Sequence, residues 1–174
     1  MLHSNDNRPP HNREDGLESF YHVLNWMALR HTSHSFSSEM LTFELHRIFD
    51  SAYRSHGGRV AGGQAKRSEL STGHTNMDAA FKNQPLAELL ETVRQLVAVR
   101  YQREPNGKAE QRDIDRYQSK MNKLHKREEF TSLFAEALAS DQDWVSNGAR
   151  VDNKLVNLQV RYMPLYNMYL GTTL

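Results

Sequence analysis

The segment of residues 14–29 constrains the fold more than any other, because it predicts a helix with apolar side chains around most of its circumference. A surface helix shows one apolar stripe. Here the large apolar residues fall on several faces: Leu17, Phe20, Val23, Leu24, Trp26, Met27 and Leu29. Such a helix needs cover on most sides, yet only a short polar stretch precedes it. We therefore expect this chain to be the later part of something larger.

Acidic residues mark the start of this helix. We expect Asp15 to cap it by accepting hydrogen bonds from backbone N–H groups of the first turn, with Glu18 reaching back to the cap. The helix is then placed at about residues 16–31. Residues 1–13 are polar and without periodicity, which is typical of a disordered terminus.

Composition limits the function classes. The 174 residues suit one domain or one large piece of a domain, and the net charge of +1 gives no overall field for nucleic acid or an anionic membrane. The absence of cysteine excludes disulfides and zinc–thiolate sites. No apolar signal segment or membrane span is present in the sequence. We expect an intracellular protein, cytoplasmic or nuclear, without a membrane partner.

The periodicity after the first helix predicts a mainly α protein. A second helix is expected at residues 38–53 and a long loop with two glycine pairs at 54–80. The clearest amphipathic pattern predicts a third helix at 85–101, with Pro85 at a position that helix starts favour.

The second half of the chain has weaker patterns. Residues 103–129 are dense in charge and predict an exposed helix or a mobile insert, and residues 130–138 predict a fourth amphipathic helix. Residues 146–174 form an irregular tail to which we assign no structure. Its apolar and aromatic side chains between 154 and 169 would form an adhesive patch if exposed.

The first helix carries a motif of a known family. Glu14-Asp15-x-Leu17-Glu18-Ser19-Phe20, followed by an aromatic residue, Val23-Leu24 and Trp26, resembles the large central helix of the C-terminal lobe in fungal-type protein kinases, a divergent branch of the protein kinase superfamily. Later features agree in order and cover roughly residues 9–145: Phe49-Asp50, Gly62-Gly63-x-x-Lys66, and Phe81-Lys82-Asn83-Gln84-Pro85-Leu86 before a helix ending near Tyr101.

The resemblance implies an incomplete protein-kinase-like C-lobe helical bundle over residues 14–145. Phosphoryl transfer needs a phosphate-covering loop, a lysine, a base and carboxylates on magnesium. In this family these motifs precede the central helix, so ATP and Mg are expected only with the full kinase domain. The aspartate that holds the catalytic loop in kinases would fall at Gly16, and Asp15 is one residue away. We assign no catalytic, cofactor-binding or metal-binding residue to this chain.

Other motifs favour structural interpretations. His46-Arg47-Ile48-Phe49-Asp50 resembles a scrambled H-R-D, but its apolar residues belong to a core face. The spacing Gly58-x-x-x-x-Gly63 lacks the lysine and hydroxyl residue of a phosphate loop. Ser19 lies in a helix expected to be buried, so we discount it as a nucleophile.

Two clusters of residues are candidates for ligand binding. The first cluster consists of His22, His31 and His34, which lack converging carboxylates for a zinc ion. The second is the basic run of Lys120, Lys123, Lys126 and Arg127, which is balanced by acidic residues and predicts a solvated helix face. We expect neither a metal nor nucleic acid as a partner.

Two functions remain open. The chain is expected to be a C-lobe fragment that is inactive as a phosphotransferase on its own, or a non-catalytic helical protein–protein interaction module. A third, weaker alternative is a helical accessory protein that binds nucleic acid. In each case an uncovered first helix would expose much apolar surface, which predicts a protein partner or self-association.

Overall fold

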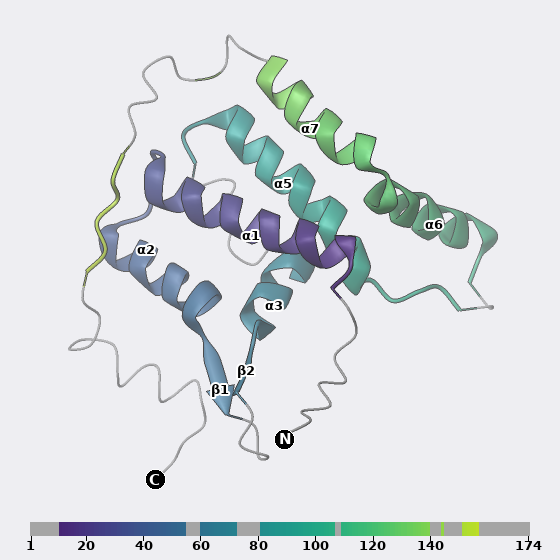
Figure 1. The fold of residues 1–174 in the computed structure, drawn as a ribbon, viewed down its shortest axis with the longest axis horizontal. Helices are drawn as coiled ribbons and strands as arrows, with labels where there is room; N and C mark the ends of the chain where they lie inside the picture. Colours follow the sequence, from purple (N-terminus) through teal and green to yellow (C-terminus); the bar gives the residue numbers. More distant parts are fainter. Residues whose placement is uncertain are drawn as a thin grey trace, which may run out of the picture.

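The computed structural model describes residues 11–54, 60–72, 81–106, 109–139, 144 and 151–156. Over these ranges the protein is mainly helical, as expected, with one short antiparallel sheet (Figure 1). The elements are α1 (Arg13–His31), α2 (Ser38–Leu45), a π-helical turn η1 (His46–Asp50), β1 (Ala52–Arg54), β2 (Val60–Gly62), α3 (Gln64–Thr72), α5 (Gln84–Ala98), a 3-10 turn η2 (Val99–Tyr101), α6 (Gln111–His125) and α7 (Arg127–Ala139).

Helix α1 is central and runs against α5 (Figure 1). Its C-terminal half joins a core cluster with α2, η1 and the start of α5, in which Leu29, Leu41 and Leu90 are almost fully buried. Its N-terminal half joins a second cluster, where Tyr21 packs with α3, α5 and α7. The helix thus connects the two parts of the core.

The start of α1 differs from the expected one. Asn12 is the cap, and its side-chain oxygen accepts from the backbone N–H of Asp15 at 2.9 Å. Asp15 is the third helical residue, and its carboxylate accepts from the backbone N–H of Asn12 at 3.0 Å. The assignment of Asp15 as the cap was therefore wrong by three residues. Asn, like Asp, is a preferred cap, and Asp15 completes the reciprocal capping box.

The second helix was predicted too long. It passes into the wider turn η1 at His46 and ends at Asp50, after which Ser51 is extended and residues 52–54 form β1. The predicted loop 54–80 was also wrong in part, because β1 pairs with β2, and α3 follows directly. Gly63, with φ of 84°, makes the left-handed turn between β2 and α3 that glycine adopts readily.

The third predicted helix is confirmed as α5 and η2. The Asn83 side chain accepts from the backbone N–H of Leu86 at 2.9 Å, and Pro85 lies in the first turn, as helix starts favour. The predicted apolar face is buried for the most part: Leu86, Leu89, Leu90, Val93 and Val97.

For residues 103–129 the sequence predicts an exposed helix or a mobile insert, and the structure shows the helix, α6. Leu124, at 1% exposure, is its buried anchor. Helix α7 begins at Arg127 and packs its apolar residues against the second core cluster, but Leu138 is 65% exposed. Figure 1 shows α6 and α7 together at one side of the molecule.

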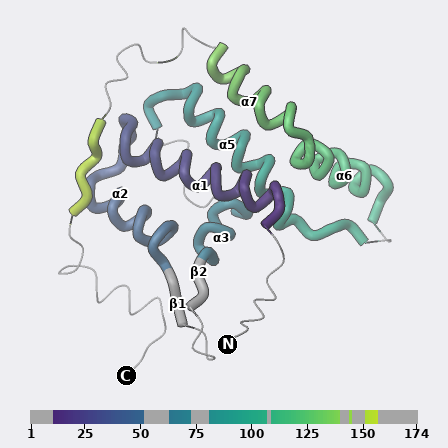
Figure 2. The backbone as a smooth tube through the Cα atoms, viewed as in Figure 1, coloured from purple at the N-terminus to yellow at the C-terminus, as the bar shows by residue number. Residues whose placement is uncertain are grey.

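Residues 151–156 cover the C-terminal end of α1. The Asn153 side chain donates to the carbonyl oxygens of Leu29 and Thr32 at 2.9 and 2.8 Å, and its backbone N–H donates to Arg30. The segment then passes α2, where the N–H of Val156 donates to the Thr42 hydroxyl (Figure 2). The expectation of a disordered terminus was wrong for Asn12 and Arg13, which cap and begin α1. The expectations for residues 1–10, 146–150 and 157–174 lie outside the described residues.

Candidate functional site

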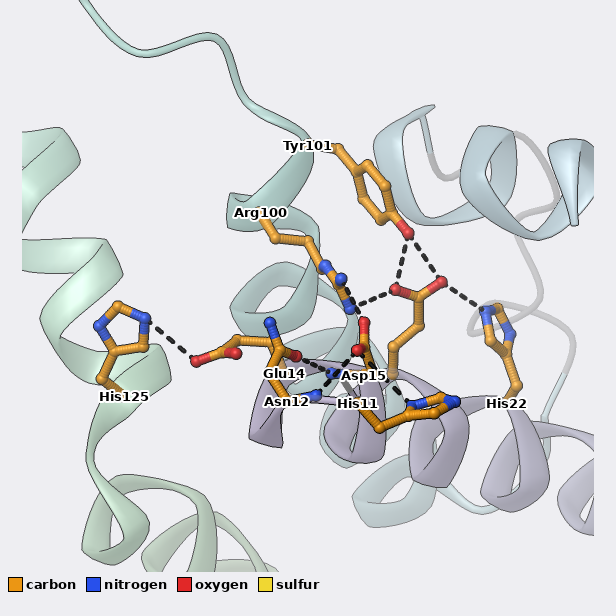
Figure 3. Close-up of polar contacts among 9 residues, drawn as sticks. His11, Asn12, Glu14, Asp15, His22, Arg100, Tyr101 and His125 are labelled. Carbon is orange, nitrogen blue, oxygen red and sulfur yellow. Dashed lines mark hydrogen bonds and ion pairs between the residues drawn. The ribbon is translucent and has the colours of Figure 1, made fainter. Parts of the chain in front are cut away.

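The N-terminal half of α1 and the turn η2 carry a cluster of charged groups (Figure 3). The guanidinium of Arg100 donates to Asp15 at 2.6 Å and to Glu18 at 2.7 Å. The hydroxyl of Tyr101 donates to the two oxygens of Glu18 at 2.8 and 2.6 Å. The helix start places both carboxylates one turn apart on one side of α1, and η2 brings the two donors opposite them.

These contacts fix the charge states of the cluster. The hydrogen bond from Arg100 holds the pKa of the Asp15 carboxyl below its usual value, and the backbone N–H of Asn12 acts in the same direction. Burial raises the pKa of Tyr101 to about 12, and its hydrogen bond to Glu18 contributes. At neutral pH Asp15 is therefore a carboxylate, and Tyr101 is a neutral phenol that acts as a donor. The polar groups of the cluster satisfy one another.

An open pocket of about 510 Å³ lies beside this cluster. Its wall combines the charged residues with apolar side chains of α1 and η1 and with one lysine of α3. The lining residues are His11, Asp15, Glu18, Ser19, His22, Val23, Trp26, Phe49, Lys66, Arg100 and Tyr101. The pocket is thus polar at its α1 start and apolar toward the middle of the helix.

His22 is the unusual residue of the pocket wall. Its side chain is 7% exposed, and neither ring nitrogen has a hydrogen-bond partner within the described part of the chain. Nε2 lies 3.9 Å from the nearer Glu18 oxygen, which is beyond hydrogen-bond distance. Burial lowers the pKa of His22 to about 4, and the positive charge of Lys66 acts in the same direction. The imidazole is therefore neutral at pH 7.

An exposed apolar row runs along α1 next to the pocket. Phe20, Val23, Trp26 and Met27 are 45, 57, 39 and 50% exposed. We call these four residues the α1 row. The expected shortage of cover on this helix is therefore found on one face, whereas the opposite face, with Tyr21, Ala28 and Leu29, is buried.

The scrambled H-R-D motif lies in η1 and has structural contacts. Arg47 pairs with Glu44 at 2.7 Å and with the buried Glu69 of α3 at 3.3 Å. His46 lies 3.3 Å from Asp50 at the exposed surface. Arg47 thus joins η1 to α3.

The other sequence candidates do not converge. Gly63 precedes α3, and Gly58 lies outside the described residues. Nε2 of His34 lies 2.9 Å from the carbonyl oxygen of Leu29, whereas His31 lies beside Trp26. In the described ranges no group of three or more His, Asp or Glu residues is placed to hold a metal ion.

Ser19 and the basic run are exposed. Ser19 was expected to be buried, but it lies at the surface of α1 and lines the pocket. The basic residues at 120, 123, 126 and 127 are exposed at α6 and the start of α7, consistent with a solvated face. No helix in the described part of the chain combines the length and apolar character needed to cross a membrane.

Sequence reasoning missed Arg100 and Tyr101. They lie 82 to 85 residues from their partners on α1, so no local spacing indicates the contact. Asp15 and Glu18, one helical turn apart, match the pattern of capping residues, and this match hid their second role.

Comparison of this chain with models of protein families, with curated proteins and with solved structures found no match.

Proposed function

We propose that this protein is a non-catalytic helical interaction module that binds a protein partner through the α1 row. The observation that carries the proposal is the exposure of these four large side chains, at 39 to 57%, on the helix that also connects both core clusters. Contiguous apolar patches of this kind on soluble proteins commonly mark binding sites. Two of the four are aromatic residues, Phe20 and Trp26, and aromatic residues are enriched in the centres of interfaces.

The pairing of the charged groups supports a non-catalytic role. A catalytic acid or base needs a perturbed group within hydrogen-bond reach of a reacting atom. Here Glu18 is occupied by Arg100 and Tyr101, and the ring nitrogens of His22 are shielded from solvent. The exposed Ser19 makes no hydrogen bond to His22 in the described structure. The cluster therefore stabilises the junction of α1 with η2.

The resemblance to the C-lobe of fungal-type protein kinases suggests what the module derives from. In that interpretation α1 corresponds to the central helix, and the α1 row corresponds to the face against which preceding segments of a kinase domain would pack. The chain would then be a C-lobe fragment without phosphotransferase activity of its own. The central place of α1 in the core and the one-sided exposure of its apolar residues support this proposal.

A co-purification experiment tests both parts. The preceding segment of a fungal-type kinase, from the N-lobe through the activation segment, is co-expressed with this chain as a separate polypeptide. We expect the two to co-purify, and Val23→Lys in the α1 row to abolish the complex. Met40→Lys is the matched control, since Met40 is also half exposed, at 48%, but lies on α2. No complex, or a complex insensitive to Val23→Lys, would refute the kinase-fragment role.

The absence of catalysis is tested on the full chain alone. We expect calorimetric titration with Mg-ATP to give no binding heat at micromolar concentrations. Binding at micromolar affinity would overturn the proposal. Mapping the 5′ end of the transcript complements this test, since an in-frame H-R-D and D-F-G upstream would assign the chain to a longer kinase.

A further inference from the structure

We propose that the α1 row packs against the α1 row of a second copy of this chain, with the two helices antiparallel and a two-fold axis near Val23. This inference rests on the proposed interaction role of the row and names its occupant. Three properties of α1 carry it: the spacing of the residues along one side, the area of the exposed side chains and the dipole of the helix.

The spacing is that of a helix-pairing seam. Gly16, Phe20, Val23, Met27 and Arg30 follow one another at intervals of four, three, four and three residues. This is the a/d spacing of paired helices, which keeps one stripe facing the partner. Gly16 is exposed, and a side chain there would meet nothing within 4 Å. The stripe therefore continues, unobstructed by neighbouring side chains at Gly16, toward the start of the helix.

A two-fold axis at Val23 exchanges Gly16 with Arg30 and sets Met27 opposite Ser19. The same axis places Phe20 of one copy opposite Trp26 of the other, and Val23 opposite itself. Phe20 already makes edge-on contacts with Phe130 and Phe134 of α7, with ring centroids 5.6 and 5.7 Å apart. Trp26 lines the apolar end of the pocket. Trp26 of the second copy would therefore meet the Phe20, Phe130 and Phe134 rings, and Phe20 of the second copy would meet Trp26 beside the open pocket.

The exposed area suits a weak dimer. With side chains of about 150–250 Å² and exposures near one half, the α1 row offers about 300–500 Å² of apolar surface per copy. Stable interfaces bury roughly 800 Å² per partner, of which little more than half is apolar. The row can thus supply the apolar centre of an interface at the lower end of this range. Dimerisation should depend on concentration in the micromolar range and should not be obligate.

The helix dipole favours the antiparallel arrangement, because it sets the positive N-terminal end of one α1 beside the negative C-terminal end of the other. The charged side chains at the two ends are paired within the chain, Glu14 with His125, Asp15 with Arg100 and Arg30 with Asp152, so they do not select the direction.

Sedimentation of the full chain at about 5 to 500 µM tests the dimer. We expect the mean mass to rise toward that of two chains. Val23→Lys places two ammonium groups at the axis and should weaken the dimer at least about tenfold, whereas the control Met40→Lys should change it less than about twofold. Circular dichroism checks that both variants remain folded. A wild-type chain that stays monomeric at the highest concentration, or equal effects of the two variants, would overturn the proposal.

Disulfide trapping tests the direction of the helices, and the cysteine-free chain allows single cysteines to be read without background. Val23→Cys should form a covalent dimer on mild oxidation, because the residue meets itself at the axis. Gly16→Cys should not, because it lies opposite Arg30 of the other copy. Trapping of both variants would indicate parallel helices, and trapping of neither would reject the seam.

The two proposals fail separately. A Val23-dependent dimer that does not co-purify with the kinase segment would leave the dimer standing and remove the kinase-fragment role. A strictly monomeric chain that binds the kinase segment through Val23 would do the reverse.

Discussion

Acid should destabilise this protein through His22, whose imidazole is buried in the wall of the pocket. The pKa of His22 is about 4 in the folded chain, against 6.5 when the residue is solvated. Between these values the unfolded chain takes up a proton that the folded chain does not. Stability therefore falls as the pH decreases from about 6.5 toward 4, and this contribution is fully present above pH 6.5.

The size of the effect follows from the two pKa values. At pH 5 nearly all unfolded molecules and about a tenth of folded ones carry the proton on His22. Proton linkage between pH 7 and pH 5 then removes about 2 kcal/mol from the free energy of unfolding. The carboxylate of Glu18 lies 3.9 Å from Nε2 of His22. This distance is too long for a hydrogen bond, but it is short enough for the carboxylate to attract the protonated ring. Closer approach of these groups on protonation would reduce the loss.

Urea unfolding of the full chain at pH 7 and pH 5, followed by far-UV circular dichroism, measures this loss. We expect His22→Gln, which has no titratable group, to lose about 2 kcal/mol less than the wild type over this interval. His46→Gln is the matched control, because His46 is 54% exposed and lies beside Asp50 at the surface. The reasoning is refuted if His22→Gln and the wild type show parallel pH dependence.

Further predictions concern the backbone and the end of α1. Gly16→Ala should stabilise the chain by about 0.5–1 kcal/mol, since the site is exposed and helical, whereas Gly63→Ala should destabilise it by about 1 kcal/mol, since φ is 84° there. Thermal melting compares the two, and an equal shift in the same direction would contradict both assignments. Asn153→Ala removes two hydrogen bonds to α1 carbonyls and should cost about 1–3 kcal/mol in urea unfolding. Lys154→Ala, at an exposed neighbouring position, should be neutral, and equal losses in the two variants would argue against this cap.

The parts of the fold that sequence reasoning predicted are those set by local patterns. Helix α5 shows this best, because an asparagine cap, an early proline and apolar residues at helical spacing all agree. Helix α3 shows the limit of the method. Its polar composition and the glycines before it indicate a loop. The helix is stabilised instead by long-range contacts of the fully buried Leu70 and by the hydrogen bond from Arg47 to Glu69. Such contacts leave no periodic signal.

The charged cluster could not be predicted for a related reason. Asp15 and Glu18 match the pattern of a helix start, and Asp15 does take part in the capping box. Each carboxylate also binds Arg100, more than eighty residues away. A sequence pattern assigns one role to one residue, whereas a carboxylate has two oxygens and can serve two partners.

The apolar character of α1 and its shortage of cover within the chain were both recognised from the sequence. The described structure covers one face and leaves the α1 row exposed. Hydrophobic periodicity reports how much of a helix avoids water, and it does not report which molecule provides the cover. The spacing of the row, which continues through Gly16 and Arg30 at helix-pairing intervals, adds the missing information and favours a second α1 helix as that cover.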